Sequence, residues 1–226
     1  MNKRQEYDNP RRGHVLLFAG PNGAGKDTIE AQFTDRHADA TRIVRHITRP
    51  AAPTEVEGED YHFVTESHFE NMIGEDAFIE YAQYIGMRSG TSNAELDRAV
   101  RRARFANITA NFEDGLTLYR KLGERGLSRV CFFISPVAYD VFNDDPDEYL
   151  AALRRRMSNR GRASDLVEAR LVKAAQYRDL YLTRQEDVTY INNSDGQLEE
   201  AGRTIDHVAE ALVISAPNEV PAPIVS

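Results

Sequence analysis

The residues whose types and spacing point most directly to chemistry lie in the segment 18–28, which reads FAGPNGAGKDT. Gly20, Gly23 and Gly25 allow a tight turn in which consecutive backbone N–H groups point inward, and Lys26 adds a positive charge. This is the pattern of a loop that surrounds nucleotide phosphates, with the lysine against the β- and γ-phosphates. The segment therefore predicts a nucleotide-dependent phosphotransferase.

The sequence on either side of this loop predicts a strand before it and a helix after it, which is the context in which such loops occur. Residues 14–19 form a continuous apolar run, typical of a buried parallel strand. Residues 28–33 continue as a helix, whose N-terminus adds partial positive charge where the phosphates would bind. The residues expected to contact ATP are Gly20, Asn22, Gly23, Ala24, Gly25, Lys26, Asp27 and Thr28.

The residue after the lysine departs from the usual pattern of this loop, which has Ser or Thr there as a magnesium ligand. Here that residue is Asp27, and Thr28 follows it. Both side chains carry oxygen, so the sequence leaves open which of them binds the metal. The predicted cofactors are ATP and Mg²⁺.

Apolar runs alternate with helical patterns along the rest of the chain. Strands are predicted at 14–19, 107–112, 129–134 and 188–192. Helices are predicted at about 92–104, from Pro146 onward, and at about 164–182. This alternation is typical of an α/β domain with a central parallel sheet. We expect a polar N-terminal arm over 1–12, one domain over 13–214 and a loose, flexible tail over 215–226.

The composition limits the classes of function. The 226 residues carry a net charge of −8, with a pI near 5.3, which argues against a non-specific nucleic-acid binder. The single cysteine, Cys131, lies in an apolar run and cannot form a disulfide framework. We recognise neither a signal peptide nor a membrane span, and expect a cytoplasmic protein whose partner is a small molecule. Monomer and homodimer both stay open.

The pattern changes between Arg49 and Gly90. Pro50, Pro53 and Gly58 interrupt the chain before a short alternating strand at 60–64. Composition alone leaves two interpretations of this segment open, an insert that binds the phosphoryl acceptor and a surface meander.

Four motifs in this segment resemble the GMP-binding region of guanylate kinases. They are ITRP at 47–50, EVEGEDYHFV at 55–64, FIE at 78–80 and GT at 90–91. With the phosphate loop and a later arginine-rich segment, the resemblance covers roughly residues 14–212. It implies a three-layer P-loop fold like that of nucleoside monophosphate kinases, with a central parallel sheet, an acceptor-binding insert at about 45–91 and an arginine-rich lid at about 154–170.

The resemblance also implies roles for individual residues. In that family the residues matching Arg49 and Tyr61 bind the acceptor phosphate, the one matching Glu80 reads the guanine edge, and the one matching Thr91 helps to hold the nucleotide. The chemistry agrees, because a guanidinium suits a phosphate and a carboxylate accepts from the paired N–H groups of guanine.

Three positions depart from the family's pattern. Ala52 replaces a second phosphate-binding arginine, Ser89 replaces a tyrosine, and Asn111 replaces a second base-reading aspartate. An amide presents both a donor and an acceptor, so Asn111 would read a different edge or no base. Arg45 and Arg88 are candidates to restore positive charge. The predicted acceptor-binding residues are thus Arg45, Arg49, Tyr61, Glu80, Arg88, Thr91 and Asn111.

The arginine-rich segment RRRMSNRGR at 154–162 is followed by Arg170. Arg160 and Arg170 match lid arginines of the family, which close over the phosphates and stabilise charge on the transferred group. We expect Lys26, Arg160 and Arg170 to be catalytic, and Arg160 also to contact ATP. Asn192 and Asn193 are similar to the asparagine that approaches adenine in these kinases, although a strand-to-helix turn explains them equally well.

The sequence thus predicts ATP-dependent, magnesium-assisted phosphoryl transfer to a phosphorylated acceptor, with GMP or dGMP as first candidates. Two alternatives stay open. GKDT at 25–28 and HITR at 46–49 look more like ribose 1,5-bisphosphate phosphokinases, whose base-free acceptor would explain Ser89 and Asn111. A guanylate-kinase-like domain can also be a non-catalytic interaction module, although such modules usually lose the phosphate loop.

Overall fold

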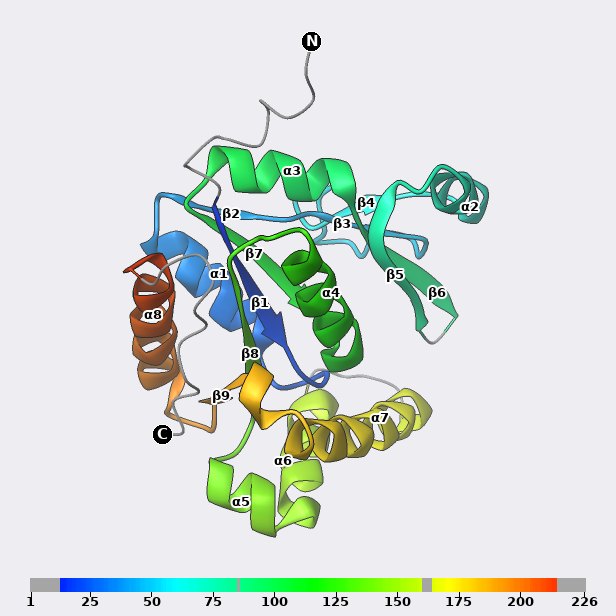
Figure 1. Ribbon diagram of the computed structural model, residues 1–226. Coiled ribbons are helices and arrows are strands. Elements are labelled where there is room, and N and C mark those ends of the chain that lie inside the picture. The colour runs from blue at the N-terminus through cyan, green and yellow to red at the C-terminus, as the bar shows by residue number, and fades with distance from the viewer. Residues whose placement is uncertain (1–12, 85, 160–163, 215–226) are drawn as a thin grey trace.

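The computed structural model describes residues 13–84, 86–159 and 164–214. Its centre is a five-stranded sheet in which every pair of neighbouring strands is parallel (Figure 1). The order across the sheet is β2 (Ala40–Arg42), β7 (Phe105–Ala110), β1 (His14–Ala19), β8 (Arg129–Ser135) and β9 (Thr189–Asn192). Residues 15–19 of β1 are fully buried, as expected for a central strand that is covered on both faces.

Helices cover the two faces of this sheet and give the molecule three layers. α1 (Lys26–Arg36) and α8 (Leu198–Ile214) pack together on one face, and α4 (Phe112–Glu124) covers the other (Figure 1). α3 (Asn93–Arg102) packs on β7 and β2. This arrangement confirms the predicted three-layer α/β fold with a central parallel sheet.

A second group of helices packs near the end of the sheet formed by β8 and β9. It consists of α5 (Tyr139–Asp144), α6 (Pro146–Ser158), α7 (Ser164–Leu182) and the short 3₁₀ helix η1 (Gln185–Asp187). Aromatic rings join these helices to the sheet, because Tyr181 lies 4.8 Å from Phe133 and 5.7 Å from Tyr190, measured between ring centroids. This packing fixes the position from which α7 approaches the phosphate loop.

Residues 45–92 form a second, four-stranded sheet with a helix. Its order is β4 (Tyr61–Phe63), β3 (Arg45–Ile47), β6 (Met87–Ser92) and β5 (Phe78–Tyr84), and α2 (Glu66–Gly74) follows β4. β5 contacts α4, where Lys121 Nζ donates to the carbonyl oxygen of Ile79 at 2.7 Å. The segment is therefore a folded insert and not a surface meander.

The predicted element boundaries hold where capping signals are strong. Ser92 accepts a hydrogen bond from the Glu95 N–H at 3.2 Å at the start of α3, and Pro146 begins α6. The strand predicted at 107–112 is wrong by two residues, because β7 ends at Ala110 and Asn111 is the N-cap of α4. Phe112 continues the apolar run in sequence, but it packs edge-on against Phe133 from the helix.

Four stretches of the sequence lie outside the described residues. They include the predicted arm and tail, and also residues 160–163 within the predicted lid. Among the described residues, no helix is long and apolar enough to cross a membrane.

Candidate active site

The phosphate loop connects β1 to α1, and its glycines have conformations that other residues rarely adopt. Gly20 has a φ of +138° and Gly25, the N-cap of α1, has a φ of +94°. A Cβ at Gly20 would lie 2.7 Å from the carbonyl oxygen of Ile134, and one at Gly25 would lie 2.4 Å from Asn193 Nδ2. Both positions therefore require glycine, for backbone conformation and for space.

Two residues that were not assigned to the phosphate loop by sequence hold its backbone. The Asn193 side chain, 7% exposed, donates to the carbonyl oxygen of Ala24 at 2.7 Å. Arg156 donates to the backbone oxygen of Asn193 and to Asp195 Oδ1, each at 2.7 Å. The sequence feature that could have indicated this contact is the polar turn after the last strand. The carboxyl ends of parallel strands meet at one edge of a sheet, so this turn and the phosphate loop after β1 lie at the same edge.

A cavity of about 80 Å³ lies beside the loop. Its walls are formed by Asn22, Gly23, Gly25, Lys26, Asp27, Thr28, Met157 and Arg170. Lys26 Nζ donates to the carbonyl oxygen of Pro21 at 2.9 Å within the loop itself. The structure thus brings predicted residues of the loop and Arg170 of α7 to one cavity, whereas Arg160 lies outside the described residues.

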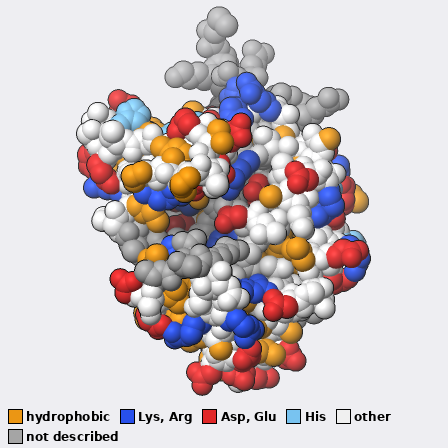
Figure 2. Space-filling model, turned by 180° about the vertical axis from the view of Figure 1, so that it is seen from behind, with side chains coloured by type: hydrophobic (Ala, Val, Ile, Leu, Met, Phe, Trp, Pro, Cys, Tyr) orange, Lys and Arg blue, Asp and Glu red, His pale blue; other side chains and the backbone are white. Residues whose placement is uncertain are grey.

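A second cavity, of about 120 Å³, lies between the loop and the insert. It is lined by Asn22, Lys26, Asp27, Arg45, Ile47, Tyr61, Ala82, Met87, Ser89, Thr109, Ala110, Asn111, Asp114 and Arg170. The two cavities share Asn22, Lys26, Asp27 and Arg170, so they adjoin. Seen from behind, a hollow containing Lys or Arg side chains lies between the insert and the body of the molecule (Figure 2).

Of the predicted acceptor-binding residues, Arg45, Tyr61 and Asn111 line this second cavity. Burial raises the pKa of the Tyr61 hydroxyl, and the charge of Asp27 adds to this effect. The hydroxyl therefore stays protonated at neutral pH and can donate a hydrogen bond to a bound group.

Glu80 contacts both Arg45, which lines this cavity, and Thr91. Arg45 Nη2 donates to Glu80 Oε1 at 2.8 Å, and Thr91 Oγ1 donates to the same oxygen at 2.7 Å. The side chains of Arg45 and Glu80 are 9% and 3% exposed. Burial lowers the pKa of Arg45, but Glu80 and other anionic neighbours raise it by more, so the guanidinium stays charged.

Arg49 is held within the insert instead of lining the cavity. It forms a two-point ion pair with Glu55, at 2.6 and 2.5 Å, and its guanidinium lies 5.2 Å from the centre of the Tyr61 ring. The hydrogen bonds from Arg49 lower the pKa of Glu55. An acceptor phosphate would therefore have to replace Glu55 as the partner of Arg49.

Arg88 and Asn192 are also not among the residues that line the two cavities. Arg88 pairs with Glu70 and lies 3.5 Å from Glu66, both on α2. Asn192 Oδ1 accepts a hydrogen bond from the Ser194 N–H at 3.0 Å, which is the geometry of a strand-to-helix turn.

A guanylate kinase family model matches residues 12–159, which include the phosphate loop and the whole insert. The chain is 33% identical to a guanylate kinase of Thermus thermophilus over 167 residues, which are 72% of this chain and 67% of that protein. The chain belongs to the guanylate kinase family. It is 28% identical to a guanylate kinase of Sulfurimonas denitrificans over 214 residues, which are 94% of this chain and 95% of that protein.

Comparison with solved structures supports the fold of this guanylate kinase family member. The crystal structure of guanylate kinase from Anaplasma phagocytophilum superposes with a TM-score of 0.65 at 22% identity, over 93% of this chain and 92% of that one. The family assignment confirms the predicted enzyme class, a nucleoside monophosphate kinase that uses ATP and Mg²⁺ and acts on small nucleotides.

The exposed oxygens beside Lys26 suit the magnesium ion that these kinases use. Asp27 and Thr28 are both exposed and line the loop cavity. No cluster of three or more potential metal-ligating side chains occurs in the described part of the chain. Mg²⁺ usually takes one or two side-chain oxygens and completes its shell with water and substrate phosphates, and Asp27 and Thr28 can supply such oxygens.

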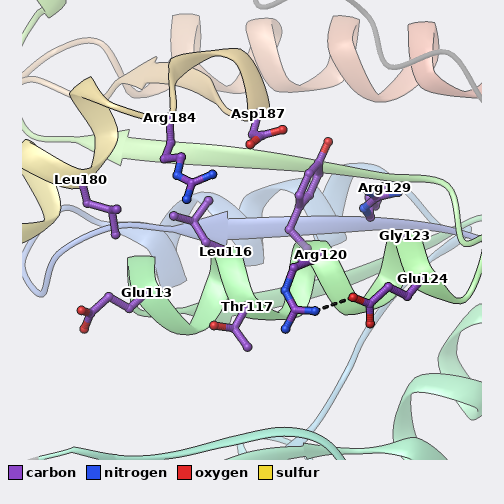
Figure 3. Close-up of a pocket in the computed structure, with 11 residues that line it drawn as sticks. Glu113, Leu116, Thr117, Arg120, Gly123, Glu124, Arg129, Leu180, Arg184 and Asp187 are labelled. Atoms are coloured by element: carbon purple, nitrogen blue, oxygen red, sulfur yellow. Dashed lines mark hydrogen bonds and ion pairs between the residues drawn. The ribbon is translucent and has the colours of Figure 1, made fainter.

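A larger cavity, of about 830 Å³, lies apart from the guanylate kinase site. It is lined by Glu113, Leu116, Thr117, Tyr119, Arg120, Gly123, Glu124, Arg129, Leu180, Arg184 and Asp187 (Figure 3). None of these residues belongs to the phosphate loop. The charges in its lining are balanced, because three arginines stand against Glu113, Glu124 and Asp187. Arg120 pairs with Glu124, and the Arg129 guanidinium stacks on Tyr119 with its central carbon 4.3 Å from the ring centre.

Proposed function

We propose that this enzyme transfers the γ-phosphoryl group of Mg-ATP to GMP or dGMP. The observation that carries the proposal is the junction of the two cavities at Lys26, Asp27 and Arg170. A phosphoryl group bound at this junction would lie between the phosphate-binding loop and the acceptor cavity. This is the geometry that phosphoryl transfer requires, because its catalysis consists mainly of positioning and charge stabilisation.

Different residues of the chain contribute to separate parts of this phosphoryl transfer. The backbone N–H groups of residues 20–26 bind the donor phosphates, and Lys26 neutralises charge on the group that moves. Arg170, with Arg160, stabilises the transition state. Asp27 borders both cavities and Thr28 only the first, which favours Asp27 as the side chain nearer to the metal between the two substrates.

On the acceptor side, Arg49 and the Tyr61 hydroxyl orient the phosphate of the acceptor. The cation of Arg49 reaches it once the phosphate displaces Glu55. No general base is needed, since the acceptor phosphate is itself a nucleophilic anion. The intact loop and its lysine support catalysis over a role as an interaction module, and the guanylate kinase relatives support a nucleotide acceptor over a sugar bisphosphate.

The test is ADP release from Mg-ATP with GMP, dGMP, AMP, IMP or ribose 1,5-bisphosphate as acceptor. We expect turnover with GMP or dGMP, reduced by about 10²-fold or more in Lys26→Ala, because a preorganised cation at the transferred group is lost. Lys173→Ala, which removes a lysine paired with Glu113 on the surface, is the matched control and should keep wild-type turnover. Turnover with ribose 1,5-bisphosphate alone would contradict the proposal.

A further inference from the structure

A buried carboxylate in α1 lies close to the phosphate loop but lines neither cavity. Glu30 follows Lys26 by one helical turn, and its side chain is only 3% exposed. Thr34 Oγ1 donates to Glu30 Oε1 at 3.3 Å, and Arg42 Nε lies 3.6 Å from Glu30 Oε2. Burial raises the pKa of Glu30, and the charge of Arg42 is the strongest effect that opposes this rise. Arg42 thus favours the ionised form of a carboxylate that burial disfavours.

Arg42 lies where the chain leaves the central sheet. It is the last residue of β2, and only Ile43 and Val44 separate β2 from β3, the first strand of the insert (Figure 1). Both connecting residues are buried, and the Ile43 N–H donates to the carbonyl oxygen of Asn107 in β7 at 2.7 Å. The backbone next to Arg42 is therefore fixed to the central sheet.

A second nitrogen of the same guanidinium contacts the insert. Arg42 Nη1 lies 3.7 Å from Asp60 Oδ1. The other oxygen of Asp60 accepts a hydrogen bond from the Val56 N–H at 2.8 Å, within the turn that leads into β4 and Tyr61. Arg42 thus forms a bridge from the helix of the phosphate loop to the turn that positions Tyr61.

We propose that Arg42 is a positioning residue that holds the acceptor-binding insert against α1, through Glu30 on one side and Asp60 on the other. This inference rests on the proposed function and specifies what keeps its acceptor site in place. None of the three residues is among the described residues that line the two cavities. The bridge therefore acts through the position of the insert, and not by contact with a substrate.

Such a bridge should matter for the acceptor and not for ATP. The donor phosphates are bound by the loop, which is held by Asn193 from outside the insert. The acceptor cavity, in contrast, is lined by residues of the insert and of the body together. When the insert leaves its position, fewer molecules have a complete acceptor site, and the apparent affinity for the acceptor falls by that fraction.

The first test is Asp60→Asn, with the KM for GMP and the KM for ATP as readouts. Asparagine keeps an oxygen that can accept from the Val56 N–H, but it lacks the charge that attracts Arg42. The buried pair of Arg42 with Glu30 stays intact in this variant. We expect the KM for GMP to rise by about two- to fivefold, the range of a partly exposed ion pair, and the KM for ATP to stay unchanged.

Arg104→Gln is the matched control. Arg104 also lies between two carboxylates, 3.6 Å from Asp39 and 2.6 Å from Glu210, but both belong to the body of the molecule. This variant should keep both KM values. A purely structural effect of any variant would lower the amount of folded enzyme, and hence the apparent kcat, without changing either KM.

Arg42 itself is changed together with Glu30, because Arg42→Gln alone would leave a buried carboxylate unpaired. Arg42→Gln/Glu30→Gln should raise the KM for GMP by at least the factor found for Asp60→Asn. Adding Asp60→Asn to this double variant should raise that KM no further, since the charge that Asp60 contacts is already absent. Independent sites would instead give factors that multiply.

Four results would overturn the inference. They are an Asp60→Asn variant with an unchanged KM for GMP, a KM for ATP that rises as much as that for GMP, an equal rise in the Arg104→Gln control, and factors that multiply in the triple variant. In each case turnover of GMP leaves the proposed function intact. A wild type that phosphorylates no nucleoside monophosphate would instead contradict the proposed function and this inference together.

Discussion

At the scale of single residues, Asn192 and Asn193 show how neighbouring side chains of one type differ in role. Asn193 is buried and binds the backbone of the phosphate loop at Ala24, whereas Asn192 closes a local turn. Removing the Asn193 amide leaves the buried carbonyl oxygen of Ala24 with a long, 3.4 Å contact from Arg156 as its remaining hydrogen bond among the described residues. The position of the loop thus depends on a residue that lies far from it in sequence.

We predict that Asn193→Ala raises the KM for ATP and lowers the free energy of unfolding by about 1–3 kcal/mol, the cost of an unsatisfied buried polar group. Urea unfolding and steady-state kinetics measure the two effects. Asn192→Ala is the control and should change both less. If Asn192→Ala raised the KM for ATP more than Asn193→Ala did, the adenine-side role predicted for Asn192 would replace this account.

The ion pair between Arg49 and Glu55 gives a second prediction. Glu55→Gln weakens the interaction that an acceptor phosphate has to displace, so the KM for GMP should fall by about two- to fivefold, the range of a partly exposed pair. Arg49→Ala should raise that KM. An unchanged KM in both variants would show that Arg49 does not bind the acceptor.

The sequence predicts the phosphate loop well because its signals are local. Glycine and lysine at a fixed spacing can be recognised without knowing the rest of the fold. The pairing of Arg45 with Glu80 could not be predicted in the same way, since the two residues are 35 positions apart and meet only through the register of β3, β6 and β5. The role of Glu80 in reading the base comes from the FIE motif at 78–80 and stays a prediction.

At the scale of elements, the sheet of the insert contains a histidine whose protonation opposes folding. His46 of β3 lies 4.7 Å from the ring of His62 and edge-on to Phe78, and its Nδ1 is buried without a hydrogen-bond partner among the described residues. Burial, and then the neighbouring His62, lower the pKa of His46 to about 4. The folded insert therefore favours the neutral ring.

The sign of the effect on stability follows from this lowered pKa. Between pH 6.5 and about 4, the unfolded chain binds a proton at residue 46 that the folded chain does not. Stability from this group should be complete above pH 6.5 and fall as the pH is lowered through that window. Urea midpoints of the wild type and His46→Phe should diverge there, with the variant less sensitive to acid. Parallel curves would contradict this role of His46.

Element boundaries were predicted less well than element types. The strand β7 ends two residues earlier than its apolar run suggests, because the aromatic ring of Phe112 packs on the core equally well from a helix. The three residues of β2 do not form an apolar run that would predict a strand, since all of them are partly exposed at the sheet edge. Both differences arise from tertiary packing.

At the scale of the whole molecule, the phosphate loop and α7 line both adjoining cavities, and the insert lines the acceptor cavity. Such a site should stabilise the folded chain when it is occupied. We predict that Mg-ATP raises the midpoint of thermal unfolding with increasing concentration, by an amount that corresponds to about 2.7 kcal/mol at one hundred times Kd. Lys26→Ala should reduce this stabilisation, and a midpoint independent of Mg-ATP in the wild type would contradict ATP binding.

The measurement that tests the central claim most directly is the transfer of label from [γ-³²P]ATP to GMP in the presence of Mg²⁺. The account predicts labelled GDP with the wild type and a loss of about 10²-fold or more with Lys26→Ala. Label that stays in ATP, or that appears only as inorganic phosphate, would contradict the claim that this chain phosphorylates GMP.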